Sequence, residues 1–318
     1  MAKKWTRRDC MKILGIGGMA LPMSQTASFF YNPGRRVFKN KGIHLFSKHL
    51  QWLDYDGMAK AAREMGFDGV DLTVRPKGHV WPEKVEEDLP RAVEAIQKAG
   101  LKAELITTAI TSAEEKYTEK IIKTASQLGI QYYRMGWLKY EDNEPIPEQL
   151  ERFKTQFKAL EEMNRHYNIH GAYQNHAGDS VGSPVWDIWY LIRDLDPQWL
   201  GCRFDVRHAM VEGMNSWTVG LRLLQPYIHS LDLKDFQWKK EEGRWKVETV
   251  PIGEGAVDFP AYFQLLVELK IEAPITLHVE YPLGGANDGA TQITIPDEAV
   301  FEAISKDREK LETLMSVD

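Results

Sequence analysis

The sequence predicts a single α/β domain, a closed (β/α)8 barrel of the TIM-barrel kind. From residue 43 onward, short apolar runs alternate with longer amphipathic segments. Eight strand candidates alternate with eight helix candidates, which is the order that a parallel barrel requires. The chain has 318 residues and 43% of them are hydrophobic, enough for one large core. A single barrel typically takes about 250 residues, so the length does not call for a second domain.

The strand candidates are short apolar runs, and most of them end in polar or charged residues. They are residues 43–46, 69–74, 102–107, 131–135, 170–175, 201–206, 228–233 and 275–280. The helix candidates are amphipathic, and they are residues 55–65, 87–99, 114–128, 148–168, 184–194, 216–226, 258–270 and 297–315. Long polar connections follow four of the strands, at 75–86, 136–147, 176–183 and 234–257. Loops of this length at the carboxyl ends of barrel strands usually carry the active site.

Glycines mark the ends of three predicted helices. Gly66, Gly100 and Gly129 each stand just before a strand candidate. Glycine readily takes the left-handed conformation that closes a helix at such a turn. Pro90 lies inside the second helix candidate, so that helix either contains it or begins near it, with the proline in the first turn.

The first 27 residues are predicted to be a targeting segment, with the barrel domain in residues 28–318. Arg7 and Arg8 precede an apolar stretch at 13–23, and small polar residues follow it. This design is typical of a bacterial signal peptide, and the paired arginines favour the twin-arginine type. We therefore expect a periplasmic, exported protein without stable membrane insertion after cleavage, because the apolar stretch is too short to span a bilayer. A disordered N-terminal tail is the alternative.

Charge and cysteine usage argue against two classes. The net charge is −6, and removing the five basic residues and one acidic residue of 1–27 would lower it to −10. A chain this acidic is a poor candidate for binding nucleic acid. Cys10 lies in the predicted signal, so Cys202 has no partner for an internal disulfide in the mature chain. The sequence also lacks a dinucleotide-binding glycine motif after a strand, a Walker loop and a nucleophile elbow.

Acidic and polar residues end four strand candidates in the second half of the chain: Gln174, Asp205, Asp232 and Glu280. The carboxyl ends of parallel strands meet at one end of a barrel, so these side chains should converge there. Buried carboxylates are tolerated only when they are paired, hydrogen-bonded or bound to metal. Three carboxylates and one amide therefore predict an oxygen-rich site for a divalent cation.

Other polar residues near the strand ends are candidate substrate contacts. They are Arg75, His79, Arg134, His176, His208 and Glu254. Lys234 directly follows the seventh strand candidate and could neutralise an enolate or donate to a carbonyl oxygen. For Lys234, the structural alternative is an ion pair with a barrel carboxylate. For Arg75 and His79, the alternative is that residues 75–86 form a surface loop without a role in binding.

Four short motifs resemble those of the xylose isomerase-like barrel superfamily, also called the sugar phosphate isomerase/epimerase family. They are Phe204-Asp-Val-Arg-His208-Ala, Leu231-Asp-Leu-Lys-Asp235, Pro251-Ile-Gly-Glu-Gly255 and Val279-Glu280. The resemblance covers about residues 40–315, and the 75–86 loop and Gln174-Asn-His176 resemble an exported branch common in Bacteroidetes-like genomes. The resemblance implies one bound divalent metal, with Mn, Mg or Co favoured and Ca or Zn as alternatives.

Carried over by position, the four metal ligands of the epimerases become Gln174, Asp205, Asp232 and Glu280. His208 matches a substrate-contacting histidine of that family. Two departures stand out. Gln174 replaces a glutamate that also transfers protons in the 3-epimerases, and an amide cannot take a proton. Asp232 replaces a histidine, which makes the site more oxygen-rich and favours Mg, Mn or Ca over Zn. Because Gln174 cannot take a proton, a symmetric epimerisation between two glutamates is not expected.

We therefore expect a metal-dependent sugar isomerase or epimerase that removes a proton next to a carbonyl. Glu280 is the expected base, Lys234 would stabilise the enediolate, and His208 is the third catalytic candidate. A lyase or dehydratase that expels a β-substituent, for example from a 3-keto-glycoside, is the alternative within the same chemistry. A non-catalytic carbohydrate-binding barrel is the alternative of another class. The expected partner is a small sugar or keto-sugar, not nucleic acid, and the sequence is compatible with a homo-oligomer.

Overall fold

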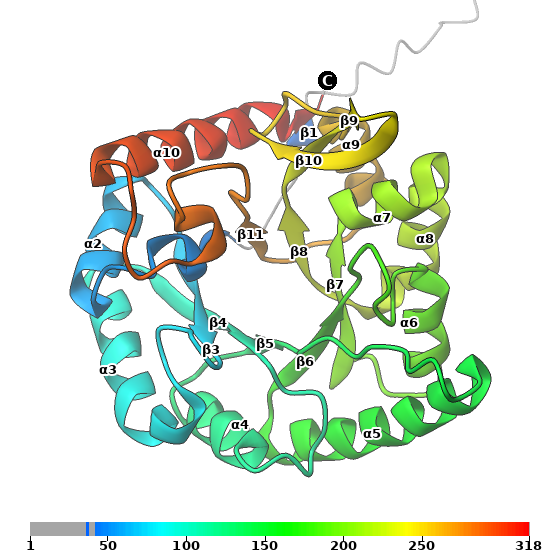
Figure 1. Cartoon of the computed structure of the whole chain (residues 1–318). Coiled ribbons are helices and arrows are strands. Elements are labelled where there is room, and N and C mark those ends of the chain that lie inside the picture. Colours follow the sequence, from blue (N-terminus) through cyan, green and yellow to red (C-terminus); the bar gives the residue numbers. More distant parts are fainter. Residues whose placement is uncertain (1–35, 38–41, 318) are drawn as a thin grey trace, which may run out of the picture. The chain divides into compact units, whose positions relative to one another are not determined.

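The computed structural model describes residues 36–37 and 42–317, and its central feature is a closed barrel of parallel strands (Figure 1). The barrel strands are β2 (Ile43–Phe46), β3 (Gly69–Val74), β4 (Lys102–Thr108), β5 (Tyr132–Arg134), β6 (His170–Gln174), β7 (Leu200–Asp205), β8 (Ile228–Leu233) and β11 (Ile275–Leu277). They follow in chain order around the barrel, and β11 closes it by pairing with β2. The predicted (β/α)8 barrel is confirmed, whereas the predicted signal segment, 1–27, lies outside the described residues.

Helices surround the barrel strands on their outer side (Figure 1). The α-helices are α2 (Tyr55–Glu64), α3 (Val85–Lys98), α4 (Thr118–Gln127), α5 (Ile146–Tyr167), α6 (Val185–Ile192), α7 (Val206–Gly213), α8 (Trp217–Leu224), α9 (Phe259–Glu268) and α10 (Asp297–Leu314). Short 3-10 helices are η1 (Ser47–Leu50), η2 (Pro82–Lys84), η3 (Met214–Ser216), η4 (Gln225–Tyr227) and η5 (Ala286–Asp288). In the part of the chain that the structure describes, no helix has the length and apolar character needed to cross a membrane.

Local sequence explains how a helix such as α2 forms. Asp54 caps it, because its Oδ1 accepts a hydrogen bond from Gly57 N at 2.8 Å. Met58 and Ala62, one turn apart, are buried on the face that packs against the core. After the helix, Gly66 adopts φ +82°, the left-handed conformation expected at this position.

The structure differs from the predicted elements in three places. The expected polar connection at 234–257 contains an antiparallel hairpin, β9 (Asp235–Glu241) and β10 (Arg244–Val250). Helix α7, which begins immediately after β7, was not predicted. Strand β11 ends at Leu277, although His278 N still donates to Leu233 O at 2.9 Å. Pro90 lies inside α3, which begins at Val85, so the helix contains the proline, as the first of the two alternatives predicted. The two short strands β1 (Arg36–Val37) and β12 (Ser316–Val317) also pair with each other.

Alternation along the strands separates an apolar layer from a polar barrel interior. In β3, Val70, Leu72 and Val74 belong to the hydrophobic core. Asp71, which lies between them in the sequence, instead contacts Arg203 of β7. Both charged residues are at most 1% exposed. Barrel interiors are usually filled by branched aliphatic side chains, so buried charges here require an explanation.

Candidate active site

A small cavity, about 40 Å³ in volume, lies at the carboxyl ends of the barrel strands. Six of the predicted site residues line it: Arg75, Arg134, Gln174, His176, Lys234 and Glu280. Each of them ends a barrel strand or follows one within a few residues. This end of a barrel is where the active sites of such folds are found, because the loops there can vary without disturbing the strands.

Lys234 is the buried centre of this site. It directly follows β8, and its side chain is 3% exposed. Its Nζ lies 2.9 Å from Glu280 Oε2 and 3.3 Å from Asp205 Oδ2. Burial by itself would lower the pKa of Lys234, but the two carboxylates raise it above its ordinary value. The ammonium therefore remains charged and links the end of β7 to the segment after β11.

Glu280 is ion-paired through both of its oxygens. Oε2 accepts from Lys234, and Oε1 accepts from Lys48 Nζ at 3.1 Å. Burial by itself would raise the pKa of Glu280, but Lys234, His278 and Lys48 lower it well below its ordinary value. The carboxylate is therefore ionised at neutral pH, and 25% of its side chain remains exposed towards the cavity.

Asp205 connects the cavity to the start of α7. Its Oδ1 caps that helix by accepting from His208 N at 3.0 Å. Its Oδ2 accepts from Gln174 Nε2 at 3.1 Å. Asn175 also holds the backbone of Asp205, with its Oδ1 accepting from Asp205 N at 2.8 Å and its Nδ2 donating to Asp205 O at 2.9 Å. These contacts fix the carboxylate next to Lys234.

Asp232, the remaining predicted metal ligand, lies in an adjoining cluster inside the barrel, which His278 of the cavity wall connects to Glu280. Arg203 Nε donates to Asp232 Oδ1 at 2.6 Å, and Arg203 Nη2 donates to Asp71 Oδ2 at 2.6 Å. His278 Nε2 lies 3.2 Å from Asp232 Oδ1. Burial by itself would raise the pKa of Asp232, but Arg203 and His278 lower it well below its ordinary value. The two buried aspartates thus share one guanidinium as their counterion.

This arrangement does not fit a divalent metal. A hard cation requires several carboxylate or carbonyl oxygens around one point. Lys234 Nζ already lies between the carboxylates of Asp205 and Glu280, and Arg203 binds the carboxylate of Asp232. Over residues 36–37 and 42–317, no group of three or more His, Cys, Asp or Glu side chains is placed to hold a metal ion. The geometry therefore suits fixed side-chain cations, and the metal expected from the sequence has no matching ligand set.

Arg134 lies at the end of β5 and is 3% exposed. Its Nη1 donates to Gln174 Oε1 and its Nη2 donates to Thr108 O, both at 3.3 Å. The guanidinium stacks on Trp137, with its carbon 4.3 Å from the ring centroid. Burial, together with repulsion from Arg75 and Arg203, lowers the pKa of Arg134 to about 9. This arginine is a buried cation whose two hydrogen-bond acceptors, Gln174 Oε1 and Thr108 O, are neutral.

The two predicted histidines pack together, with ring centroids 4.0 Å apart. His176 lines the cavity, and its Nδ1 lies 2.9 Å from Ala177 O. His208 is 3% exposed, does not line the cavity, and accepts from Ala177 N through Nδ1 at 3.1 Å. Burial, and then the charge of Lys234, lowers the pKa of both imidazoles. His176 can therefore exchange a proton with a bound molecule, whereas His208 is placed to position its neighbours.

The structure does not bring His79 to the cavity. Its Nδ1 lies 3.3 Å from Thr73 Oγ1, and its Nε2 lies 3.2 Å from Leu50 O. Burial lowers the pKa of His79 to about 4. These contacts tie the loop after β3 to the end of η1, which is a structural role.

Glu254 also lies away from the cavity, because Asp235 organises its loop. Asp235 Oδ2 accepts from Gly253 N at 3.0 Å and from Gly255 N at 2.9 Å. A Cβ on Gly255 would lie 2.3 Å from Asp235 Oδ1, so the loop can close in this way only with glycine there. The loop directs Glu254 into a different cavity, next to α10.

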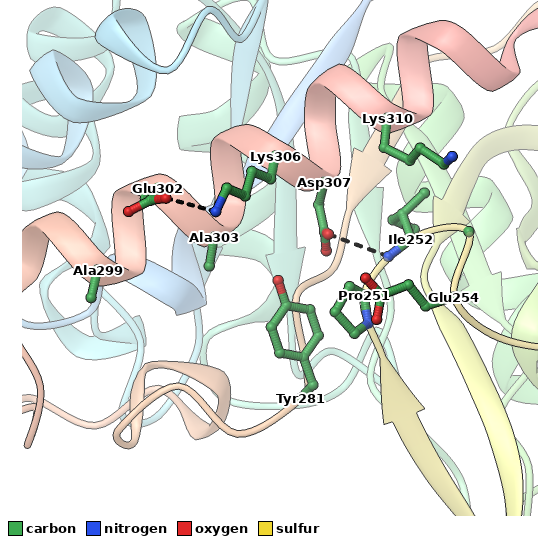
Figure 2. A pocket seen from close by; sticks show the side chains of 11 residues that line it. Pro251, Ile252, Glu254, Tyr281, Ala299, Glu302, Ala303, Lys306, Asp307 and Lys310 are labelled. Carbon is green, nitrogen blue, oxygen red and sulfur yellow. Dashed lines mark hydrogen bonds and ion pairs between the residues drawn. The ribbon is translucent and has the colours of Figure 1, made fainter.

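That second cavity is larger, about 490 Å³, and lies between α10 and the loop that includes Pro251 and Glu254 (Figure 2). Asp307 faces it and accepts a hydrogen bond from Ile252 N at 3.3 Å, while the phenol of Tyr281 points towards the same carboxyl group (Figure 2). Burial raises the pKa of Asp307 to about 7. Since Lys234, Glu280 and Arg134 all line the smaller cavity, that cavity is the candidate active site despite its size.

Sequence reasoning missed three charged residues: Lys48, Asp71 and Arg203. Arg203 stands two residues before Asp205 in the same strand, so alternation places both on the interior face. A cation at that position could have been recognised as the counterion of strand carboxylates. Lys48 gave no comparable signal, because only the folded chain brings it near Glu280.

A family model described as "Xylose isomerase-like TIM barrel" matches residues 59–299. None of the curated proteins matches the sequence. Among solved structures, the D-psicose 3-epimerase from Clostridium cellulolyticum H10, with D-tagatose, superposes with a TM-score of 0.64 at 9% identity, covering 86% of this chain and 99% of that chain.

Two further structures are similar at the same level. The 3-keto-D-glucoside 4-epimerase from E. coli has a TM-score of 0.61 at 12% identity, covering 84% of this chain and 98% of its own. A xylose isomerase-like TIM barrel protein from Mycobacterium smegmatis, in complex with magnesium, has a TM-score of 0.60 at 14% identity, with 86% and 96% covered. At these identities the similarity establishes the fold alone.

Proposed function

The chain belongs to the xylose isomerase-like TIM barrel family, and from this premise we propose that it is a sugar isomerase or epimerase that abstracts a proton next to a carbonyl. One observation carries the proposal: the Lys234 ammonium is held between the carboxylates of Asp205 and Glu280 at the wall of the cavity. An acid and a base side by side are what enolisation needs. Two sugar epimerases with the same fold support the substrate class.

Lys234 supplies the electrophile in this mechanism. The carbonyl oxygen of the sugar lies against the ammonium, which the neighbouring carboxylates keep protonated. A fixed positive charge at this oxygen stabilises the negative charge that develops there during enolisation. The neighbouring C–H bond becomes acidic enough to break at neutral pH.

Glu280 takes the proton. Its carboxylate is ionised and faces the cavity, so it can accept the proton from the carbon next to the carbonyl. The electron pair of the broken C–H bond moves to the carbonyl oxygen and gives an enediolate. Return of a proton to the opposite face of the same carbon gives an epimer, and transfer to the neighbouring carbon gives an isomer. His176 is the second proton-transfer group at the cavity: its neutral imidazole takes a proton from a substrate hydroxyl or water, and the resulting imidazolium delivers that proton to the carbon.

No step of this mechanism uses a divalent metal, because the predicted ligands are bound to lysine and arginine instead. The metal requirement expected from the sequence stays a prediction, which a chelator can test directly. We also propose that the protein acts after export, on the strength of the paired arginines and apolar stretch within residues 1–27. Phosphorylated sugars are mostly cytoplasmic, so export favours unphosphorylated substrates.

Deuterium exchange followed by NMR tests the proposal. The protein would be incubated in D2O with a panel of ketoses and 3-keto-glycosides, both with a chelator and with added Mn²⁺ or Mg²⁺. We expect deuterium to enter at the carbon next to the carbonyl, and Glu280→Gln to slow this by about 10²- to 10⁴-fold. Glu302→Gln, at an exposed residue of α10 that pairs with Lys306 beside the larger cavity, is the matched control and should exchange like the wild type.

The products separate the remaining alternatives. Inverted configuration or a moved carbonyl identifies an epimerase or isomerase, whereas loss of a β-substituent identifies a lyase acting through the same enediolate. Exchange only with added metal would restore the metal requirement. Absence of exchange with every sugar, metal present or not, would reject the enzyme and favour a carbohydrate-binding barrel.

A further inference from the structure

The wall of the active-site cavity carries more positive than negative charge. Four cationic side chains line it, Lys48, Arg75, Arg134 and Lys234, against the single carboxylate of Glu280. Asp205, which contacts Lys234 from outside the lining, adds one more negative charge. This local excess contrasts with the net charge of the whole chain, −6.

The two lysines form ion pairs with the carboxylates at the cavity, whereas the two arginines do not. Lys48 and Lys234 both pair with Glu280. In the described part of the chain, no carboxylate oxygen lies within 4.0 Å of a guanidinium nitrogen of Arg75 or Arg134. The guanidinium of Arg75 lies 5.7 Å from the ring centroid of Phe46, another residue of the cavity wall.

Arg134 shows the imbalance most clearly. An arginine carries five N–H donors in a planar fork. Two of its nitrogens donate to neutral oxygens, of Gln174 and Thr108, while its buried Nε has no hydrogen-bond partner. Trp137 covers a face of the guanidinium, which leaves the donors at its edge for a ligand. A buried, incompletely bonded guanidinium is costly unless an anion completes it.

Arg75 and Arg134 also disfavour each other. Burial is the main cause that lowers the pKa of each arginine, and the charge of Arg75 further lowers the pKa of Arg134. Two like charges at one cavity raise the free energy of the empty site, and a bound anion would remove that cost. Guanidinium groups favour carboxylates and phosphates because the planar fork matches their paired oxygens.

From this imbalance we propose that the substrate is an acidic sugar, whose anionic group binds Arg134 and Arg75 while its carbonyl lies at Lys234. The proposed export favours a carboxylate as this anion, and a phosphate is the other outcome of the test. The inference deepens the proposed function and rests on it. The anion neutralises the two unpaired arginines, and it fixes which end of the sugar faces the catalytic pair. A neutral sugar would leave both guanidinium groups without a carboxylate within 4.0 Å among the described residues, with only the more distant attraction of Asp71, Asp232 and Glu280.

Calorimetric titration of three matched hexoses tests this inference. The probes are a hexuronate, the corresponding hexose 6-phosphate and the neutral hexose, each titrated into the wild-type protein at low and moderate salt. We expect at least one acid to bind tenfold or more tightly than the neutral hexose, with an affinity that falls as salt rises. Whichever acid binds better identifies the anion as a carboxylate or a phosphate.

Variants assign the effect to the arginines. Arg134→Gln and Arg75→Gln should each reduce the ratio of the affinity for the acid to the affinity for the neutral hexose about tenfold or more. Arg91→Gln, an exposed arginine on α3 that pairs with Asp88, is the matched control and should keep the preference. Arg75→Gln keeps the test decisive if Arg134→Gln fails to fold, because Arg75 is less deeply buried.

The results distinguish this inference from the proposed function. Equal binding of acidic and neutral hexoses, or a preference that both arginine variants retain, would overturn the anion site. If a neutral ketose nevertheless exchanged deuterium in a Glu280-dependent manner, the proposed function would stand alone. Arginine-dependent binding of an acidic sugar without any proton exchange would support the anion site and reject the catalytic proposal.

Discussion

Two groups of charged residues lie within the same barrel, and they are balanced in opposite ways. Inside the barrel, Arg203 lies between Asp71 and Asp232, so two negative charges meet one positive charge, with His278 beside them. At the cavity, the positive side chains outnumber the carboxylates. The interior carboxylates are ion-paired to Arg203 within the protein, although Asp232 Oδ2 has no hydrogen-bond partner. The cavity group keeps Arg75 and Arg134 without a carboxylate partner among the described residues.

The contrast shows how to separate structural from functional charges in this fold. A charge buried for structure must have its partner within the protein, since desolvation is otherwise uncompensated. A charge that is buried without its partner is compensated by something that binds. By this criterion Arg203 belongs to the structure of the barrel, and Arg134 is the residue that we propose to bind the anion of the substrate.

The largest expected effect comes from removing the counterion of the interior group. Arg203→Met would leave the carboxylates of Asp71 and Asp232 buried without a guanidinium. We expect the free energy of unfolding to fall by about 3–5 kcal/mol, the usual result of breaking a buried ion pair from one side. Urea denaturation followed by circular dichroism measures it.

Arg134→Met is the matched comparison, because it removes a buried guanidinium that has no carboxylate partner. It should change the unfolding free energy much less than Arg203→Met. Neutralising the partners as well, in Arg203→Met with Asp71→Asn and Asp232→Asn, should recover part of the loss. Equal destabilisation by the two single variants would refute the distinction between the two groups.

A smaller effect is expected at the cavity from Lys234→Met. The variant removes the charge that stabilises the oxyanion, so proton exchange should slow by about 10²- to 10³-fold. It also leaves the carboxylates of Asp205 and Glu280 without the ammonium between them. We therefore expect Lys234→Met to bind Mn²⁺ more tightly than the wild type, measured by calorimetry. Tighter binding of Mn²⁺ by the wild type would mean that Lys234 is not the cation of the site.

The smallest expected effect concerns Asp307, a buried carboxyl group that forms no ion pair with any of the described residues. Burial raises the pKa of Asp307 from 3.8 to about 7, whereas Arg203 lowers that of Asp232 despite its burial. The folded state therefore holds a proton on Asp307 that the unfolded chain releases above pH 4. The free energy of unfolding should therefore fall by about 1–2 kcal/mol as the pH rises from 5 to 7.

Asp307→Asn removes this pH dependence, because the amide resembles the protonated carboxyl group at the edge of the larger cavity (Figure 2). Thermal unfolding at pH 5 and pH 8 would show it. The melting temperature of the variant should exceed that of the wild type at pH 8 and equal it at pH 5. A parallel fall in both proteins would place the titrating group elsewhere.

Much of the fold could be predicted from the sequence, because strand and helix periodicity is a local property. The eight barrel strands were located to within a few residues, and Gly66 has the predicted conformation. The β9–β10 hairpin was missed because its exposed faces are polar and charged, as a surface loop would be. Gln174, Lys234 and Glu280 were found because strand ends in a barrel converge.

By itself, the sequence determined the barrel and the end of it at which the polar residues gather, since chain order and alternation are sufficient for both. Only the tertiary structure decided which charged residues form ion pairs with each other. Asp232 was expected beside Glu280, but Arg203 holds it within the barrel. Glu254 was expected at the same site, but its loop closes on Asp235 and places it beside α10. Ion pairing depends on distances between residues far apart in the chain, and those distances exist only once the barrel has closed.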